Sequence, residues 1–170
     1  MIMPLVALEL SRLAVSQLQG LVKVNIDSRN AYRAAMGCIV DENISAVFRR
    51  TASERQKQAT ALQDILWASL EETEKFRPAD SDPPFRLWTE LKGMCEQGLQ
   101  ALLSEAVRIE EYVQSQYASV IATIEGRAIR QLLLEQLASV QSVQKRMTAM
   151  RDTVTEEMSQ FGVDKALTEN

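Results

Sequence analysis

The segment from Leu99 to Tyr117, with the residues that follow it up to Ile124, carries the clearest folding signal in the chain. Its apolar residues recur at steps of three and four, the spacing that places side chains on one face of an α-helix. This stripe consists of Leu99, Leu102, Ala106, Ile109, Val113 and Val120. The segment is therefore predicted to be a long amphipathic helix with one buried face.

The same spacing recurs along most of the chain. It predicts four helices, over residues 5–40, 44–74, 87–124 and 128–161. For the first segment two interpretations stay open, because Gly20 either sits within one continuous helix or separates a short helix from a longer one. Only 6 glycines and 4 prolines occur in 170 residues, and aromatic residues make up 5 %. That composition suits long helices and disfavours sheets.

The connections between these helices predict how they pack. Asp41–Asn43 and Glu125–Arg127 are short, and a short connection forces two long helices to lie antiparallel. The connection between the second and third predicted helices, residues 77–85, holds three of the four prolines and is predicted to be a loop. The predicted fold class is all-α, an antiparallel four-helix bundle, with a coiled-coil rod as the alternative. One domain over residues 1–162 and a flexible tail over 163–170 are expected.

Composition also excludes several classes of function. The chain has no histidine, so catalytic triads, zinc fingers and HExxH metalloproteases are excluded. A net charge of -4 does not favour nucleic-acid binding, and no apolar run is long enough for a transmembrane helix. Cys38 and Cys95 lack a CxxC partner and are interpreted as buried free thiols in a reducing cytoplasm.

Three segments resemble an uncharacterised bacterial family of ferritin-like four-helix-bundle proteins, known as a domain of unknown function. The segments are VFRRTASERQKQATALQ, LWTELKGMCEQGLQALLSEAVRIEEYVQSQY and LLLEQLASVQSVQKRMTAMRD. The motifs are an Ala-x-Glu-Arg segment at residues 52–55, and a Glu-x-x-Arg-x-Glu segment followed by a tyrosine, here Glu105, Arg108, Glu110 and Tyr117. The resemblance spans residues 20–152 and implies a ferritin-like bundle, but no settled activity.

The chain departs from the ligand pattern of ferritin-like di-iron proteins. Those sites use glutamates from all four helices, two of them in Glu-x-x-His pairs. Here Glu54 is followed at that spacing by Lys57, and Glu135 by Ala138. Gln144 stands where the family often has a histidine, and the first helix offers no inward glutamate but only Asn25, Ser28 and Arg29. The sequence therefore predicts no metal centre and no cofactor.

Four carboxylates are nevertheless candidate metal ligands: Glu54, Glu105, Glu110 and Glu135. Carboxylates alone can hold iron or manganese if they converge. The favoured interpretation is that Glu110 lies on the polar side with Arg108, and that Glu54 and Glu105 pair with arginines, because an unpaired buried carboxylate is costly. Polar residues on the apolar faces are expected to hydrogen-bond at the bundle centre: Asn25, Gln58, Gln136 and Gln144.

These observations favour a non-enzymatic bundle in a bacterial cytoplasm that acts through association with another protein or with a second copy of itself. The N-terminal segment carries more apolar surface than an exposed extension should, so it either folds back on its own bundle or associates with a second copy; its apolar residues are Leu5, Val6, Leu8, Leu10 and Leu13. The alternatives are a carboxylate-only metal protein, such as a degenerate di-iron protein or metal store, and a carrier of apolar ligands.

Overall fold

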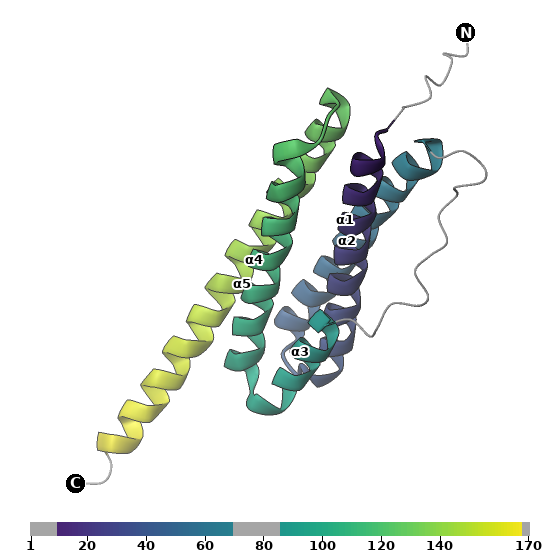
Figure 1. The fold of residues 1–170 in the computed structure, drawn as a ribbon. Coiled ribbons are helices and arrows are strands. Elements are labelled where there is room, and N and C mark those ends of the chain that lie inside the picture. The colour runs from purple at the N-terminus through teal and green to yellow at the C-terminus, as the bar shows by residue number, and fades with distance from the viewer. Residues whose placement is uncertain (1–9, 70–85, 168–170) are drawn as a thin grey trace.

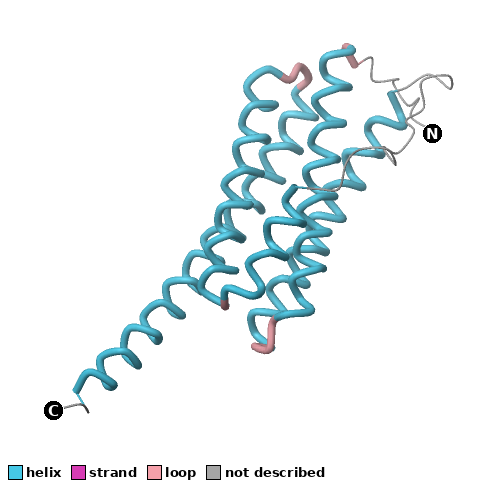
Figure 2. The backbone as a smooth tube through the Cα atoms, turned by 60° about the horizontal axis from the view of Figure 1, so that its bottom comes forward, coloured by secondary structure: helices cyan, strands magenta, loops and turns pink. Residues whose placement is uncertain are grey.

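Every regular element in the described part of the chain is helical. The structure is a computed structural model that describes residues 10–69 and 86–167. Its elements are α1 (Arg12–Ala35), the 3-10 turn η1 (Met36–Cys38), α2 (Glu42–Ser69), α3 (Arg86–Met94), the 3-10 turn η2 (Cys95–Gln97), α4 (Leu99–Thr123) and α5 (Arg127–Leu167). No strand occurs within these ranges, so the predicted all-α class is confirmed (Figure 2).

The long helices form two antiparallel hairpins, α1 with α2 and α4 with α5 (Figure 1). The second hairpin turns at Ile124–Gly126, where Gly126 adopts a φ of 97° that disfavours any residue with a Cβ. The hairpins meet where α1 packs against α4, and the short helix α3 packs against both of these helices. Side chains from both hairpins therefore share one interior.

The predicted helix over residues 87–124 is wrong in one respect, because the structure breaks it at Gly98. Here φ is 99°, a left-handed conformation that ends η2 and starts α4 in a new direction. Figure 1 shows α3 and α4 as the two arms of this turn. The sequence pattern missed the break because Leu91, Cys95 and Leu99 keep the helical spacing across it.

The helix ends also differ from the predicted ones. The first helix starts at Arg12 rather than at residue 5, because Ser11 caps it by accepting a hydrogen bond from the Ala14 amide at 3.1 Å. It then runs through Gly20 without a break. At the other end of the chain, α5 continues past the predicted stop at Gly162 to Leu167. The predicted loop at 77–85 and the end of the second predicted helix at 70–74 lie outside the described residues, as do residues 1–9.

The core is built from the predicted apolar faces. Its fully enclosed side chains come from all five helices: Leu18, Leu21, Phe48, Leu62, Leu66, Leu91, Leu103, Ile109, Val113, Leu133 and Met147. Burial of such side chains is the main favourable contribution to folding, at about 1.5–3 kcal/mol each. Within the described ranges, none of the helices combines the length and apolar character that a membrane span requires.

Cys38 and Cys95 are joined by a disulfide, with their Cα atoms 5.9 Å apart. Cys38 is exposed and Cys95 is half-buried. The prediction of two buried free thiols is therefore wrong. The physical reason is the turn at Gly98, which brings η2 back beside the end of α1. Disulfides persist mainly in oxidising environments, so the cytoplasmic location stays a prediction.

Candidate functional site

A group of buried polar side chains lies at the centre of the molecule, and we call it the polar centre. It draws on all four long helices: Asn25, Ser28 and Tyr32 from α1, Arg55 and Gln58 from α2, Glu110 and Tyr117 from α4, and Gln136 from α5. None of these residues is more than 7 % exposed. Buried polar groups at this density require mutual hydrogen bonding.

Helical spacing explains why these side chains point inward. Arg55 follows the buried residues Phe48 and Ala52 at steps of four and three, and Ala59 continues the same face of α2. Glu110 likewise lies four residues after Ala106 on the buried face of α4. Each residue therefore occupies a core position of its helix, with a polar side chain where the pattern expects an apolar one.

An ion pair between Arg55 and Glu110 forms the charged half of the polar centre. The Arg55 guanidinium bonds Glu110 Oε2, donates from Nε to Ser28 Oγ at 3.2 Å, and donates from a terminal nitrogen to Gln58 Oε1 at 2.8 Å. The Tyr32 hydroxyl donates to Glu110 Oε1 at 2.6 Å. Both carboxylate oxygens thus have a donor, which offsets part of the cost of burying the charges.

The neutral half of the polar centre is organised by Tyr117. Its hydroxyl accepts from Asn25 Nδ2 at 2.7 Å and donates to Gln136 Oε1 at 2.8 Å. Gln58 and Gln136 each donate a side-chain amide to the other's backbone carbonyl, at 3.4 and 3.3 Å. Because Gln58 also bonds Arg55, the two halves form one network that connects all four long helices.

Burial controls the ionisation of these groups. Desolvation raises the pKa of Glu110, although Arg55 opposes the shift. Burial and the neighbouring Glu110 carboxylate hold the pKa of Tyr32 well above its ordinary value, and burial raises the pKa of Tyr117 to about 12. The tyrosines therefore remain protonated donors at neutral pH. The chemical role this arrangement supports is to fix the alignment of four helices through paired charges and hydrogen bonds.

The structure does not bring the four candidate carboxylates together. Glu54 pairs with Lys57 at 3.3 Å, and Glu105 accepts two bonds from Arg108 Nε at 3.1 and 3.0 Å. Glu135 is exposed and accepts from Gln131 at 3.0 Å, whereas Glu110 lies inside the polar centre. Among the described residues there is no group of three or more His, Cys, Asp or Glu side chains arranged to hold a metal ion.

Three sequence-based expectations about polar partners need correction. Glu54 pairs with Lys57 on its own helix rather than with an arginine. Glu110 does not lie on the polar side with Arg108, because it occupies a core position and pairs across the interior with Arg55. Gln144 lies outside the polar centre, where it accepts from Gln114 at 2.8 Å. By contrast, the expected pairing of Glu105 with Arg108 and the central placement of Asn25, Gln58 and Gln136 are both found.

Sequence reasoning missed that Arg55 is fully buried and that the hydroxyls of Tyr32 and Tyr117 donate to Glu110 and Gln136 inside the molecule. The sequence does carry a signal for this internal network. Tyr32 continues the face of Leu18, Leu21, Asn25 and Ser28 at helical steps. A polar residue that keeps the core spacing on each of several helices indicates a shared internal network.

The fold and the polar centre define an all-α protein whose interior is fixed by a buried ion pair and its hydrogen bonds. A family model described as a domain of unknown function, DUF2383, matches residues 13–123. The chain belongs to this family, which confirms the resemblance to an uncharacterised family. The match ends at the last residue of α4 and does not include α5. No curated protein and no solved structure matches the chain.

The raised pKa of Tyr117 predicts a loss of stability in alkaline solution. The tyrosine in the unfolded chain ionises near pH 10, whereas the folded tyrosine keeps its proton up to about pH 12. Above pH 10 the folded state therefore binds more protons, and its stability falls as the pH rises through this window, by about 2 to 3 kcal/mol for this group. Urea denaturation at several pH values measures the effect.

Tyr117→Phe is expected to remove the part of the alkaline loss that Tyr117 causes and to leave the part that the raised pKa of Tyr32 causes, at a cost of about 1 kcal/mol at neutral pH for the lost hydrogen bonds. Tyr112→Phe is the control, since Tyr112 is 42 % exposed on the same helix, and it should leave the pH dependence unchanged. If both variants keep the alkaline loss of the wild type, Tyr117 does not cause it.

Proposed function

We propose that this protein is a non-enzymatic, ferritin-like four-helix bundle that acts by associating with a second copy of itself through the end of α5. The two antiparallel hairpins support the bundle arrangement, and so does the polar centre, which joins the four long helices through their interior. The observation that carries the functional proposal is the exposure of Met158 and Phe161, which are 57 % and 76 % exposed.

These two residues lie where α5 extends beyond α4. Gln100, in the first turn of α4, donates to Thr155 Oγ1 at 3.1 Å, so the N-terminal end of α4 lies beside Thr155 of α5. We call residues 156–167 of α5 the overhang, and Figure 1 shows it projecting past the other helices. At 1.5 Å per residue the overhang is about 18 Å long.

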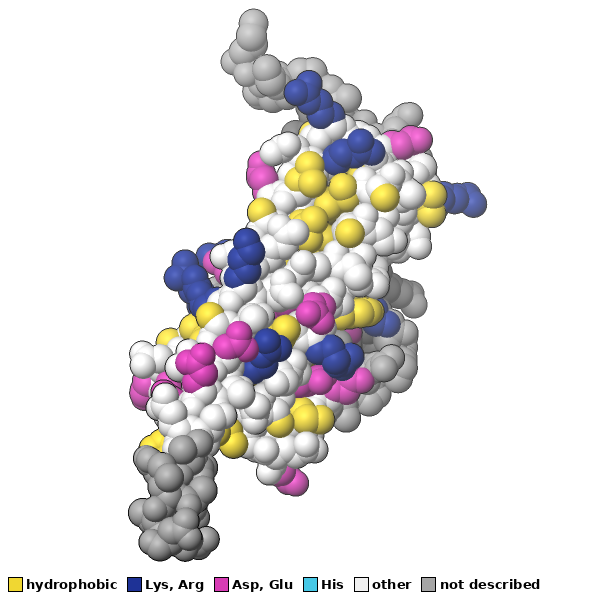
Figure 3. Space-filling view, turned by 90° about the vertical axis from the view of Figure 1, so that its left-hand side faces the viewer, with side chains coloured by type: hydrophobic (Ala, Val, Ile, Leu, Met, Phe, Trp, Pro, Cys, Tyr) yellow, Lys and Arg dark blue, Asp and Glu magenta, His cyan; other side chains and the backbone are white. Residues whose placement is uncertain are grey.

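The overhang continues the apolar stripe of α5. Met147 is buried, Met150 and Val154 are half-buried, and Met158 and Phe161 follow at steps of four and three on the same face. In Figure 3 hydrophobic atoms reach the lower end of the molecule, next to the undescribed terminal residues. A core face that continues past its covering helix exposes apolar area that association would bury.

The charges along α5 favour a second copy in antiparallel orientation. The last turns beside α4 carry the basic residues Lys145, Arg146 and Arg151, and the next turns carry the acidic residues Asp152, Glu156 and Glu157. A parallel copy places Glu156 and Glu157 of the two overhangs side by side, whereas an antiparallel copy that pairs the overhangs separates these like charges. Such pairing is two-fold symmetric, the commonest symmetry of protein oligomers.

The oligomeric state tests the proposal. Sedimentation equilibrium of the wild type is expected to show a dimer, and Met158→Ala combined with Phe161→Ala to weaken dimerisation by at least about tenfold, because two large apolar side chains leave the interface. Leu134→Ala is the matched control, since Leu134 is 44 % exposed but lies away from the stripe. A wild type that remains monomeric, or a double variant that dimerises like the control, contradicts the proposal.

A further inference from the structure

The disulfide between Cys38 and Cys95 joins two parts of the molecule that no helix connects directly. Cys38 ends η1, in the connection from α1 to α2, and Cys95 begins η2, in the turn from α3 to α4. Both cysteines thus lie in short 3-10 turns at one end of the helices. Neither belongs to the set of fully buried core residues.

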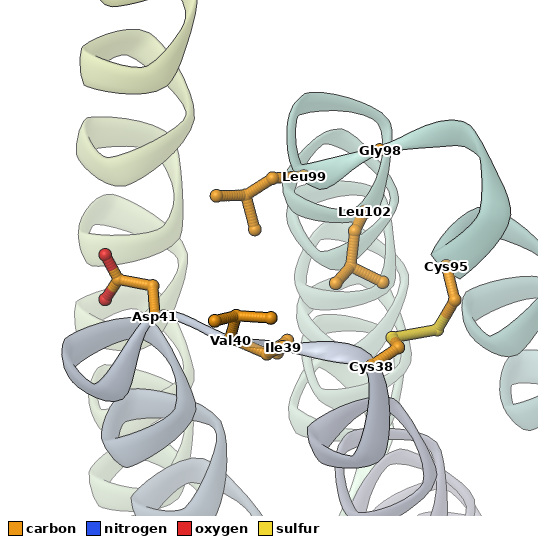
Figure 4. Close-up of a pocket in the computed structure, with 8 residues that line it drawn as sticks. All are labelled: Cys38, Ile39, Val40, Asp41, Cys95, Gly98, Leu99 and Leu102. Atoms are coloured by element: carbon orange, nitrogen blue, oxygen red, sulfur yellow. A yellow bond between two sulfur atoms is a disulfide. The ribbon is translucent and has the colours of Figure 1, made fainter.

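The disulfide also lies at the edge of a pocket of about 480 Å³. Figure 4 shows Ile39 and Val40 on the α1–α2 side and Leu99 and Leu102 on the α4 side, with the two sulfur atoms at one edge. Val40 is 98 % exposed, so this wall opens to solvent. The disulfide is the covalent link between the two walls.

We propose that the Cys38–Cys95 disulfide is a redox modification site, reduced and re-formed by dithiols while the helical core stays folded. Two observations support this. Cys38 is exposed and reachable by an external thiolate, and neither cysteine is among the fully buried core residues, since Cys95 packs half-buried against them. A disulfide within a buried core has neither property.

The exchange starts at Cys38, the more exposed of the two cysteines. A thiolate of the dithiol attacks Cys38 Sγ and forms a mixed disulfide, and Cys95 Sγ leaves with the electron pair of the broken bond and takes up a proton. The second thiolate of the dithiol then attacks the dithiol sulfur that is bonded to Cys38 Sγ. This step closes a disulfide within the dithiol and releases Cys38 as a thiolate. The protein gains two electrons, and the dithiol becomes a disulfide.

The structural effect of reduction is expected at the end of the molecule that holds the pocket. The disulfide closes a loop that contains all of α2 and α3, so its loss increases the conformational freedom of η1, α3 and η2. The polar centre lies on the long helices and keeps its own bonds. Reduction therefore loosens α3 and separates the walls of the pocket without melting α1, α2, α4 or α5.

The test combines thiol labelling with hydrogen exchange on the full-length, air-oxidised protein. Under native conditions dithiothreitol is expected to release both thiols together, as measured by alkylation and mass spectrometry, while the far-UV circular dichroism is retained. Amides of α3 and η2 should then exchange at least about tenfold faster, with α4 and α5 unchanged. Removing the reductant in the presence of oxidised glutathione should restore the oxidised pattern.

The double variant Cys38→Ser/Cys95→Ser is the control, and it should show the exchange pattern of the reduced protein with or without dithiothreitol. Three results would overturn the proposal: a disulfide that resists dithiothreitol until urea is added, a reduced protein that loses its helical signal, or two free thiols after treatment with oxidised glutathione.

Discussion

Replacing Arg55 with leucine is expected to lower the free energy of unfolding by about 3–5 kcal/mol, because it leaves the buried Glu110 carboxylate without its cation. The change also removes donors from Ser28 and Gln58. The Tyr32 hydroxyl remains as a donor to Glu110 but cannot neutralise its charge. Urea denaturation followed by far-UV circular dichroism measures the loss.

Lys57→Ala is the matched control for this prediction. Lys57 lies on the same helix and pairs with Glu54 at 3.3 Å, but its side chain is 70 % exposed, so the loss should stay below about 1 kcal/mol. Arg55→Leu combined with Glu110→Leu should recover much of the single-variant loss, because it removes both buried charges. An Arg55→Leu protein as stable as the control would show that the ion pair contributes little.

Replacing Leu91 with alanine is expected to cost about 2–4 kcal/mol and to release α3 from its neighbours. Leu91 is fully buried, and α3 packs against α1 and α4 around it. On the surface of the same helix, Glu90 pairs with Arg108. The measurement is urea denaturation of the oxidised protein, so that Cys95 stays bonded.

Leu134→Ala provides the comparison for Leu91→Ala, because it removes the same atoms from an exposed position. Its stability change should stay within about 0.5 kcal/mol. Equal effects of the two substitutions would contradict the packing of α3 described above. Faster hydrogen exchange in α3 of the Leu91 variant would link the loss of stability to that helix.

Much of the helical layout could be predicted from the sequence. The spacing of apolar residues places four long helical segments, and Asp41 in the predicted short connection caps α2 by accepting from the amides of Asn43 and Ile44 at 2.9 and 3.0 Å. Gly126 lies in the predicted turn. These features depend on residues within a few positions of each other, which is the range over which helical periodicity and capping act.

The break at Gly98 could not be predicted in the same way. The apolar spacing of Leu91, Cys95 and Leu99 fits a continuous helix, so the local pattern does not distinguish a straight helix from a reversal. The packing of α3 on α1 favours the reversal, and the glycine permits the conformation that it needs. The disulfide was missed for the same reason, since the reversal is what brings Cys95 to Cys38.

The sequence predicted most of the uncharged polar residues of the candidate site but not which charged side chains pair there. Asn25, Gln58 and Gln136 were expected at the centre and are found there. The pairing of Glu110 with Arg55 was not predicted, because the two residues lie on different helices. Whether Glu110 meets Arg55 or Arg108 depends on how the hairpins face each other.

Composition and the spacing of residues along one helix are enough to give the helical class and to put polar residues at core positions. Tertiary packing selects which polar side chains share a network, where α3 turns back, and which position Cys95 takes beside Cys38. Those contacts join residues far apart in the chain, and the packing of one helix on another selects them from several chemically acceptable partners.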